Sequence, residues 1–236
     1  MWIDGINLIQ PWNDSDVKDI IRHHARGVRM PARRTHQEQE FKAIHQFLNA
    51  GILPIIVFDG ADSRLLYKQI LLDYMKEFGA NICYEVLNEP LAMHGSPGYF
   101  DFDNPTQVVN FMNYWIDFIH SHIGNTSVLS CGIANVFSGV ENDLLRLVIE
   151  EGHQNILSIH VYTCNSIDAQ KYLPVIKKWK GPLWVTEIGT KGDKMAFYRG
   201  CLPMVYEYLH PSTMIWFDYH SPGFALIASL LWKEVF

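Results

Sequence analysis

The sequence repeats one pattern along most of its length: a short apolar run is followed by a longer segment with helical spacing. The apolar runs are Gly5–Ile9, Gly27–Pro31, Leu53–Phe58, Ile82–Leu87, Ser127–Cys131, Ile156–Tyr162, Leu183–Glu187 and Met214–Phe217. Between most of them, apolar residues recur every three or four positions, as in Phe41, Ile44 and Leu48. Such alternation is typical of parallel strands joined by crossover helices, so the sequence predicts an α/β protein.

Glycines mark the expected ends of the helices. Gly51, Gly79, Gly124 and Gly152 each lie shortly before an apolar run, and glycine is common directly after a helix C-terminus. Gly181-Pro182 precedes the seventh run in the same way. The breaks in the pattern therefore agree with the predicted strands.

Chain length and motif content favour a closed barrel over an open sheet. A (β/α)8 barrel typically needs about 250 residues, and this chain has 236. An open doubly wound sheet is the alternative, but its usual marker, a G-x-G-x-x-G turn after the first strand, is missing. No low-complexity linker divides the chain. The sequence therefore predicts a single (β/α)8 TIM barrel domain with short loops over residues 1–236.

Charge and hydropathy argue against several classes of partner. The formal net charge is −6, and basic residues form no run longer than pairs such as Arg33-Arg34, which disfavours nucleic acid and anionic membranes. No apolar run approaches the roughly 18 residues of a membrane span. Residues 1–4 lack the layout of a signal peptide. We expect a soluble monomer, either cytoplasmic or secreted with its signal removed.

Cysteine and histidine patterns give no sign of a metal or a disulfide framework. Cys83, Cys131, Cys164 and Cys201 lie far apart, so we interpret them as buried apolar residues or free thiols rather than disulfides. The 11 histidines form no H-x-H or H-E-x-x-H pattern. The sequence predicts neither a metal site nor a cofactor.

Polar residues lie where the predicted strands end, which is where barrel enzymes place their functional groups. His160 and Tyr162 alternate on the sixth run and so point to one face. The full set of polar or aromatic residues at strand ends is Arg29, Asn88, Glu89, His160, Tyr162, Glu187 and Trp216. We take these residues as the candidate site.

Two glutamates in this set point to a specific chemistry. Glu89 and Glu187 follow the fourth and seventh runs, so barrel closure would bring both carboxyl groups to one mouth. Two carboxylates facing one cavity are what glycosidic cleavage needs, one as proton donor and the other ionised. Glu85 is a rival partner for Glu89, but it lies four residues earlier on the same strand, about 13 Å away at 3.3 Å per residue. We predict that Glu85 is a buried structural carboxylate, with Arg29 as one candidate partner.

Several short strings together resemble a known enzyme family. Tyr84-Glu85-Val86-Leu87-Asn88-Glu89-Pro90, His160-Val161-Tyr162, Trp184-Val185-Thr186-Glu187-Ile188-Gly189 and Gly27-Val28-Arg29-Met30-Pro31 are similar to motifs of clan A glycoside hydrolases, family 5 most closely. The resemblance extends from Gly5 to Trp216. It implies a retaining enzyme that cleaves β-linked glycans without a metal or organic cofactor.

The resemblance also implies a role for each candidate residue. Glu89 would be the acid/base and Glu187 the nucleophile, whereas Asn88 would bind the sugar 2-hydroxyl. Arg29 and Tyr162 would hold the oxygens of the nucleophile and lower its pKa, and the nearby negative charge would raise the pKa of the acid/base. His160 would shape the site near the acid/base, and Trp216 would form a stacking floor for the sugar.

One position departs from the family, and the substrate stays open. Family 5 enzymes usually carry a histidine at the end of the third strand, where this chain has Phe58-Asp59-Gly60. We favour an endo-β-1,4-glucanase acting on an oligo- or polysaccharide. A β-mannanase or another β-glycosidase of the same clan is one alternative, and a saccharide-binding barrel without turnover is another.

Overall fold

Eight parallel strands form the centre of the computed structural model, which describes residues 4–9, 11–59, 64–96, 99–134, 136, 141–162, 172–190 and 193–217. Their order in the sheet is β5-β4-β3-β2-β1-β8-β7-β6. The strands are β1 (Gly5–Asn7), β2 (Gly27–Pro31), β3 (Leu53–Phe58), β4 (Cys83–Val86), β5 (Val128–Leu129), β6 (Leu157–Val161), β7 (Leu183–Ile188) and β8 (Thr213–Trp216). Each strand falls within or next to a predicted apolar run, which confirms the sequence pattern.

The two end strands of this order meet and nearly close the sheet into a barrel. Leu129 forms a parallel bridge with Ile156, and Ile133 forms another with Ile159. The backbone N–H of Ser130 also donates to the carbonyl oxygen of Ile156 at 3.0 Å. The fold is therefore the predicted (β/α)8 barrel and not an open sheet.

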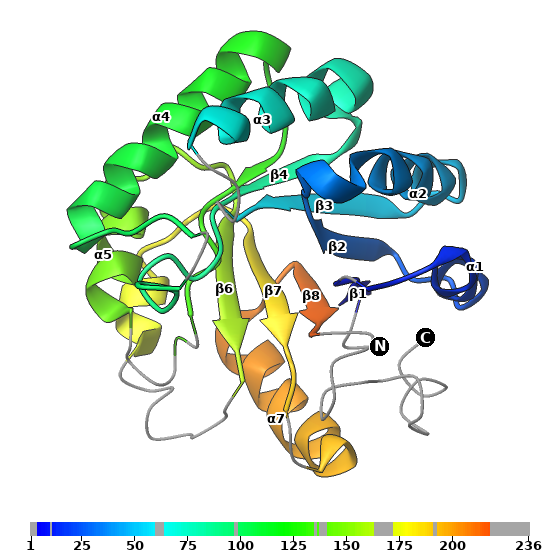
Figure 1. Ribbon diagram of the computed structural model, residues 1–236. Helices are drawn as coiled ribbons and strands as arrows, with labels where there is room; N and C mark the ends of the chain where they lie inside the picture. The colour runs from blue at the N-terminus through cyan, green and yellow to red at the C-terminus, as the bar shows by residue number, and fades with distance from the viewer. Residues whose placement is uncertain are drawn as a thin grey trace.

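Helices surround the strands on the outside (Figure 1). They are α1 (Asp14–Arg22), α2 (Gln37–Asn49), α3 (Arg64–Phe78), α4 (Pro105–Ile123), α5 (Asn142–Glu151) and α7 (Lys194–Leu209), with the 3-10 helices η1 (Arg34–His36) and η2 (Gly79–Asn81). Asn13 and Asn104 cap the first turns of α1 and α4 with their side-chain oxygens. None of the described helices is long and apolar enough to cross a membrane.

The barrel interior has two chemically different layers. Nearer the N-terminal ends of the strands lies an apolar layer, which we define as Ile55, Cys83, Leu129, Ile156, Trp184 and Ile215. Next to it lies a buried polar layer, which we define as Arg29, Glu85, Ser158, Thr186 and Glu187. Because Cys83 and Glu85 are two residues apart on β4, they face the same interior in successive layers.

The cysteines only partly follow the prediction. Cys83 and Cys131 are buried free thiols, as expected. Cys201 is disulfide-bonded, so the free-thiol prediction is wrong at this position. The prediction failed because it was based on the distance between cysteines along the sequence, and that distance does not limit which residues the fold brings together. Cys164 lies outside the described residues.

Candidate active site

Arg29 on β2 is the centre of the polar layer. Its side chain is buried and donates through Nε to Glu85 at 2.5 Å, through Nη1 to Asn7 at 3.1 Å and to Glu187, and through Nη2 to Asn88 at 2.7 Å. Burial lowers the pKa of Arg29, but the charges of Glu85 and Glu187 outweigh burial and raise it overall. The guanidinium is therefore a permanent cation that joins three strands and the loop after β4.

A bulge in β7 aims Glu187 at Arg29. Ile159 pairs with Val185, whereas the next residue of β6, His160, pairs with Glu187, so β7 contains one extra residue at Thr186. As a result, the consecutive side chains of Thr186 and Glu187 both make contacts inside the barrel. In a regular strand, neighbouring side chains would point to opposite faces.

Hydrogen bonds hold this bulge in place. Asn7 Nδ2 donates to the Thr186 carbonyl oxygen at 3.0 Å, and Thr186 Oγ1 donates to Glu85 Oε1 at 3.2 Å. Ser158 Oγ donates to the same Glu85 oxygen at 2.7 Å. Glu85 is fully buried and ion-paired with Arg29, so the prediction that it is a structural carboxylate with this partner is confirmed.

Glu89 lies at the end of a tightly turned segment after β4. Leu87 and Glu89 both have left-handed backbone angles, with φ of 71° and 43°. The Glu89 N–H donates to the Gly132 carbonyl oxygen at 2.8 Å, and a Glu89 carboxylate oxygen bonds His160 Nδ1 at 2.7 Å. A Cβ at position 132 would lie 2.5 Å from His160 Nε2, so only glycine leaves room for the imidazole ring.

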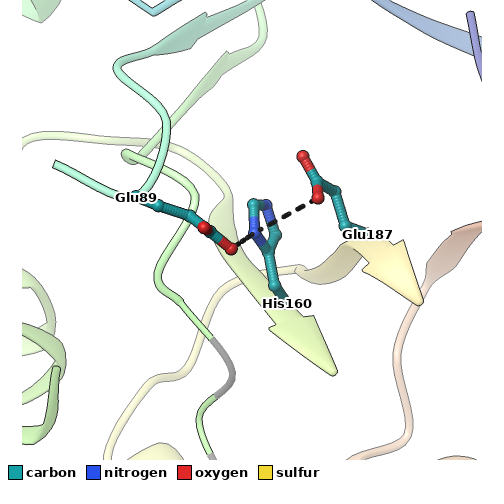
Figure 2. Close-up of side chains that lie close together, drawn as sticks. All are labelled: Glu89, His160 and Glu187. Atoms are coloured by element: carbon teal, nitrogen blue, oxygen red, sulfur yellow. Dashed lines mark hydrogen bonds and ion pairs between the residues drawn. The ribbon is translucent and has the colours of Figure 1, made fainter. Parts of the chain in front are cut away.

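The two predicted catalytic carboxylates lie close together, with the His160 ring between them (Figure 2). Single atoms of Glu89, His160 and Glu187 all lie within 4.8 Å of one another. His160 Nδ1 is 3.7 Å from Glu187 Oε2, which also accepts a hydrogen bond from the Tyr162 hydroxyl. Carboxyl groups about 5 to 5.5 Å apart characterise retaining glycosidases, whereas inverting enzymes separate them by about 6.5 to 9.5 Å.

His160 changes the expected electrostatics of Glu89. Burial raises the pKa of Glu89, but the hydrogen bond from His160 and the charges of His160 and Arg29 outweigh burial and lower it overall. Burial lowers the pKa of His160, yet the charge of Glu187 and the bond to Glu89 raise it overall. The prediction of a raised pKa for Glu89 is therefore wrong, because the pKa of Glu89 is lowered and that of His160 is raised.

The same three residues offer a set of ligand atoms that could hold a metal ion. Arg29 and Tyr162, however, each donate to one oxygen of Glu187. A cation at this site would have to compete with the guanidinium for the Glu187 carboxylate. The donor set therefore fits proton transfer and attack by a carboxylate better than metal binding.

A cavity of about 230 Å³ opens beside these groups. Five of the predicted site residues line it, namely Arg29, Asn88, Glu89, Tyr162 and Glu187. Lining residues that the sequence reasoning did not select include Asn7, Arg33, Asp59 and Phe217. Arg33 and Asp59 follow β2 and β3, so a wider search after each strand end would have found them.

Trp216 differs from the prediction. Its side chain is fully buried and packs edge-on against Phe197, with ring centroids 6.1 Å apart. A side chain without exposed surface cannot stack on a sugar. Phe217, the next residue along, lines the cavity instead. The strand pattern located the right strand end but not which of two neighbouring aromatic residues faces the cavity.

Glu141 is a further residue that the sequence did not single out. Its buried carboxylate accepts backbone hydrogen bonds from Leu91 at 2.9 Å, Ala92 at 3.0 Å and Ala134 at 2.6 Å. Leu91 and Ala92 directly follow the turn that carries Glu89. Glu141 therefore ties that turn to the segment after β5, and its position just before α5 gave no signal of this contact.

The fold is similar to solved structures of glycoside hydrolases. A GH30 endoxylanase from Clostridium papyrosolvens C71 matches with a TM-score of 0.65 at 15% identity, over 94% of this chain and 66% of the xylanase chain. An endo-1,4-β-D-mannanase from Thermotoga petrophila RKU-1 matches with a TM-score of 0.60 at 13% identity, over 91% and 87% of the two chains. XacCel5A, solved in complex with cellopentaose, matches with a TM-score of 0.62 at 12% identity, over 94% of this chain and 92% of the XacCel5A chain.

These likenesses show a shared barrel fold at low identity. The chain spans just under two thirds of the xylanase it matches. No protein-family model matches the sequence, and no curated protein has a matching sequence. The choice of reaction and substrate must therefore be argued from the site itself.

Proposed function

We propose that this protein is a retaining glycoside hydrolase that cleaves β-linked glycans by double displacement. The observation that carries the proposal is the placement of Glu89 and Glu187, whose carboxylate oxygens approach within 4.8 Å beside one cavity. A short approach of this kind supports direct attack by one carboxylate, because inverting enzymes hold their carboxyl groups farther apart to admit a water molecule. Similarity to xylanase, mannanase and cellulase-type structures supports the same reaction class.

In the first step, a Glu187 oxygen forms a bond to the anomeric carbon as the bond from that carbon to the glycosidic oxygen breaks. Glu89 gives its proton to the departing oxygen. In the second step, water transfers a proton to Glu89 and bonds to the anomeric carbon, which releases Glu187. The sugar leaves with its original anomeric configuration.

The proton for the first step is held by the Glu89 and His160 pair. His160 Nδ1 is 2.7 Å from a Glu89 oxygen, and the raised pKa of His160 beside the lowered pKa of Glu89 favours His160 as the holder of this proton. A bound sugar excludes water, and a low dielectric favours the neutral pair over the ion pair. Substrate binding thus moves the proton along this hydrogen bond to Glu89, where it is available to the leaving group.

The remaining cavity residues support the transition state. Arg29 and Tyr162 fix both oxygens of Glu187 in the orientation for attack. The Asn88 side-chain oxygen is held by Arg29 at 2.7 Å, which leaves its amide group to donate to a sugar 2-hydroxyl. Phe217, which lines the cavity with Tyr99 and Tyr162, would pack against the apolar face of the ring.

We infer that the substrate is β-1,4-glucan, which would make the protein an endo-β-1,4-glucanase. β-Mannan is the second candidate substrate. Two structures of similar fold are an endo-1,4-β-D-mannanase and a protein solved with cellopentaose, which favours β-1,4-linked hexoses. A saccharide-binding barrel without turnover remains the alternative from another class. A binding protein, however, has no need of a second carboxylate beside the first.

Mutation of Glu187 tests the proposal. Purified protein is assayed for reducing ends on β-glucan, mannan and xylan, and for nitrophenol release from aryl β-glycosides. We expect Glu187→Gln to lower kcat on the order of 10³-fold or more in a protein that is still folded, although less stable because Arg29 loses one of its two carboxylate partners. Glu207→Gln, an exposed change on α7, is the matched control and should retain full activity. Equal turnover by both variants would contradict the proposal.

A further inference from the structure

An ion pair that the proposed reaction does not use lines the same cavity as the two carboxylates. Arg33 follows β2 and Asp59 follows β3, so neighbouring strands bring the two side chains together. Arg33 Nη1 donates to Asp59 Oδ1 at 2.7 Å, and Nη2 donates to Oδ2 at 2.6 Å. Both oxygens of the carboxylate therefore bind one planar guanidinium in a two-pronged arrangement.

Hydrogen bonds to residues outside the cavity lining hold Arg33 in position. Its backbone N–H donates to Glu40 Oε2 at 3.0 Å, and the Tyr74 hydroxyl donates to the same oxygen. Glu40 is buried and belongs to α2, whereas Tyr74 belongs to α3. Arg33 Nη1 also donates to the Ala32 carbonyl oxygen at 3.2 Å. Because backbone and side chain are both held, the guanidinium is preorganised at the cavity wall.

Stability alone is a weak reason for such a pair. Removing two charges from water costs about as much as their mutual attraction returns, so a largely buried ion pair adds little to folding. Three of the five guanidinium N–H donors bind Asp59 and Ala32. The other two bind no residue that the structure describes, and the Arg33 side chain remains 24% exposed. They are therefore donors available to a ligand in the cavity.

The shared lining of the cavity places this pair beside Glu89 and Glu187. The cavity volume of about 230 Å³ is below the roughly 300 to 1,000 Å³ of sites for drug-sized ligands, which fits one monosaccharide ring. Tyr99 lines the same space. Burial and the charge of Asp59 raise the pKa of Tyr99, Arg33 lowers it, and Glu187 and Glu89 raise it further, as expected if these groups surround one space.

We propose that Arg33 and Asp59 form a clamp that binds hydroxyl groups of a neutral hexopyranosyl residue and excludes a uronic acid from this position. The inference rests on the proposed hydrolase function and names the class of sugar that the site accepts. A sugar hydroxyl both donates and accepts, so one hydroxyl or two adjacent ones can accept from Arg33 and donate to Asp59. The pair has no net charge, so it does not compensate a sugar carboxylate, which would lie beside the Glu89 and Glu187 carboxylates of the same cavity.

The sharpest test is a change in selectivity on replacing Asp59. Asp59→Asn keeps the size of the side chain but leaves Arg33 as an uncompensated cation. We expect kcat/KM for 4-nitrophenyl β-glucoside and β-cellobioside to fall roughly ten- to hundred-fold. The ratio of kcat/KM for 4-nitrophenyl β-glucuronide to that for the glucoside should rise at least about ten-fold. Arg33→Met should lower activity on the glucoside without this rise.

Arg34→Met is the matched control. Arg34 is the adjacent residue, but its guanidinium pairs with Asp73 at 2.8 Å and does not line this cavity. Its kcat/KM values should stay within about two-fold of the wild type. A glucuronide-to-glucoside ratio that is the same in the wild type and Asp59→Asn would overturn the clamp.

A binding measurement on the wild-type protein separates the clamp from catalysis. The side-chain Nε–H signal of Arg33, assigned by its loss in Arg33→Lys, is followed by NMR while methyl β-cellobioside is added. A shift of this signal supports the clamp, even if no aryl glycoside is hydrolysed and the proposed function fails. Shifts around Glu187 without a shift at Arg33 would overturn the clamp and keep the function. Absence of any shift, together with absence of turnover, would contradict both.

Discussion

The apolar and polar layers of the barrel interior fill the same space with opposite chemistry. The apolar layer requires only volume, because its six side chains have no buried charge to satisfy. In the polar layer, every side chain is bound to another member of the layer: Arg29 to Glu85 and Glu187, and Ser158 and Thr186 to Glu85. The first layer should tolerate small changes, and the second should not.

The largest expected effect is the loss of Arg29. Arg29→Met leaves Glu85 and Glu187 buried without their cation, so we expect the free energy of unfolding to drop by about 3–5 kcal/mol. Activity should be lost as well, because Glu187 loses its orientation. Denaturant unfolding and glycosidase assays measure the two effects. If Arg29→Met lowers the free energy of unfolding by less than about 1 kcal/mol, the polar layer is no more sensitive to substitution than the apolar layer.

Glu40, which lies on α2 and not in the barrel interior, is expected to control much of the pH dependence of stability. Burial raises the pKa of Glu40 to about 7, despite hydrogen bonds from Tyr74 and Arg33 that lower it. A raised pKa stabilises the fold below the ordinary value of 4.5, and this contribution is lost as pH rises through about 7.

Glu40→Gln tests this assignment. The wild type should lose roughly 3 kcal/mol of unfolding free energy between pH 4.5 and pH 8 from this group, and Glu40→Gln should lose much less. His160, whose pKa is also raised, should leave a smaller decline in the same direction above pH 6.5. Urea unfolding at each pH provides the measurement. Identical pH profiles for both proteins would show that Glu40 does not govern the dependence.

Thr186→Val tests the hydrogen bonds of the polar layer one at a time. The change keeps the shape of the side chain but removes its bonds to Ser158 and Glu85. We expect a loss of about 1–3 kcal/mol in unfolding free energy. Because Thr186 is the extra residue of the bulge, kcat should fall more than KM changes. A stable variant with wild-type kcat would indicate that the bulge does not depend on this side chain.

Ile55→Val provides the reference from the apolar layer. Loss of one methylene group should cost about 0.5–1.5 kcal/mol. The effect on kcat/KM should be within about two-fold, since the Ile55 side chain belongs to the apolar layer. A large loss of activity here would mean that the two layers are coupled, and the comparison would fail.

The fold and the carboxylate pair were predictable because they depend on periodicity. Apolar runs identify strands, and a glutamate at the end of a parallel strand must lie at one mouth of a barrel, as Glu89 and Glu187 do. The burial of Glu85 followed in the same way from the two-residue repeat of β4.

What the sequence did not reveal depends on contacts between strands. The bulge at Thr186 is a matter of register, and sequence gives no register for parallel strands. The bond between His160 and Glu89, which lowers the pKa of Glu89, needs the ring position that Gly132 permits. The clamp joins Arg33 and Asp59, which follow two different strands. The burial of Trp216 depends on which face of β8 its side chain takes at the end of the strand.

The anomeric configuration of the first product tests the central claim most directly, because it reports whether one carboxylate attacks the sugar. Proton NMR is recorded during the first minutes of hydrolysis of an aryl β-glycoside that the protein cleaves. With one oxygen of Glu89 and one of Glu187 within 4.8 Å of each other, we expect the β-anomer to appear first and the α-anomer only later by mutarotation. Initial release of the α-anomer would show inversion and contradict the account.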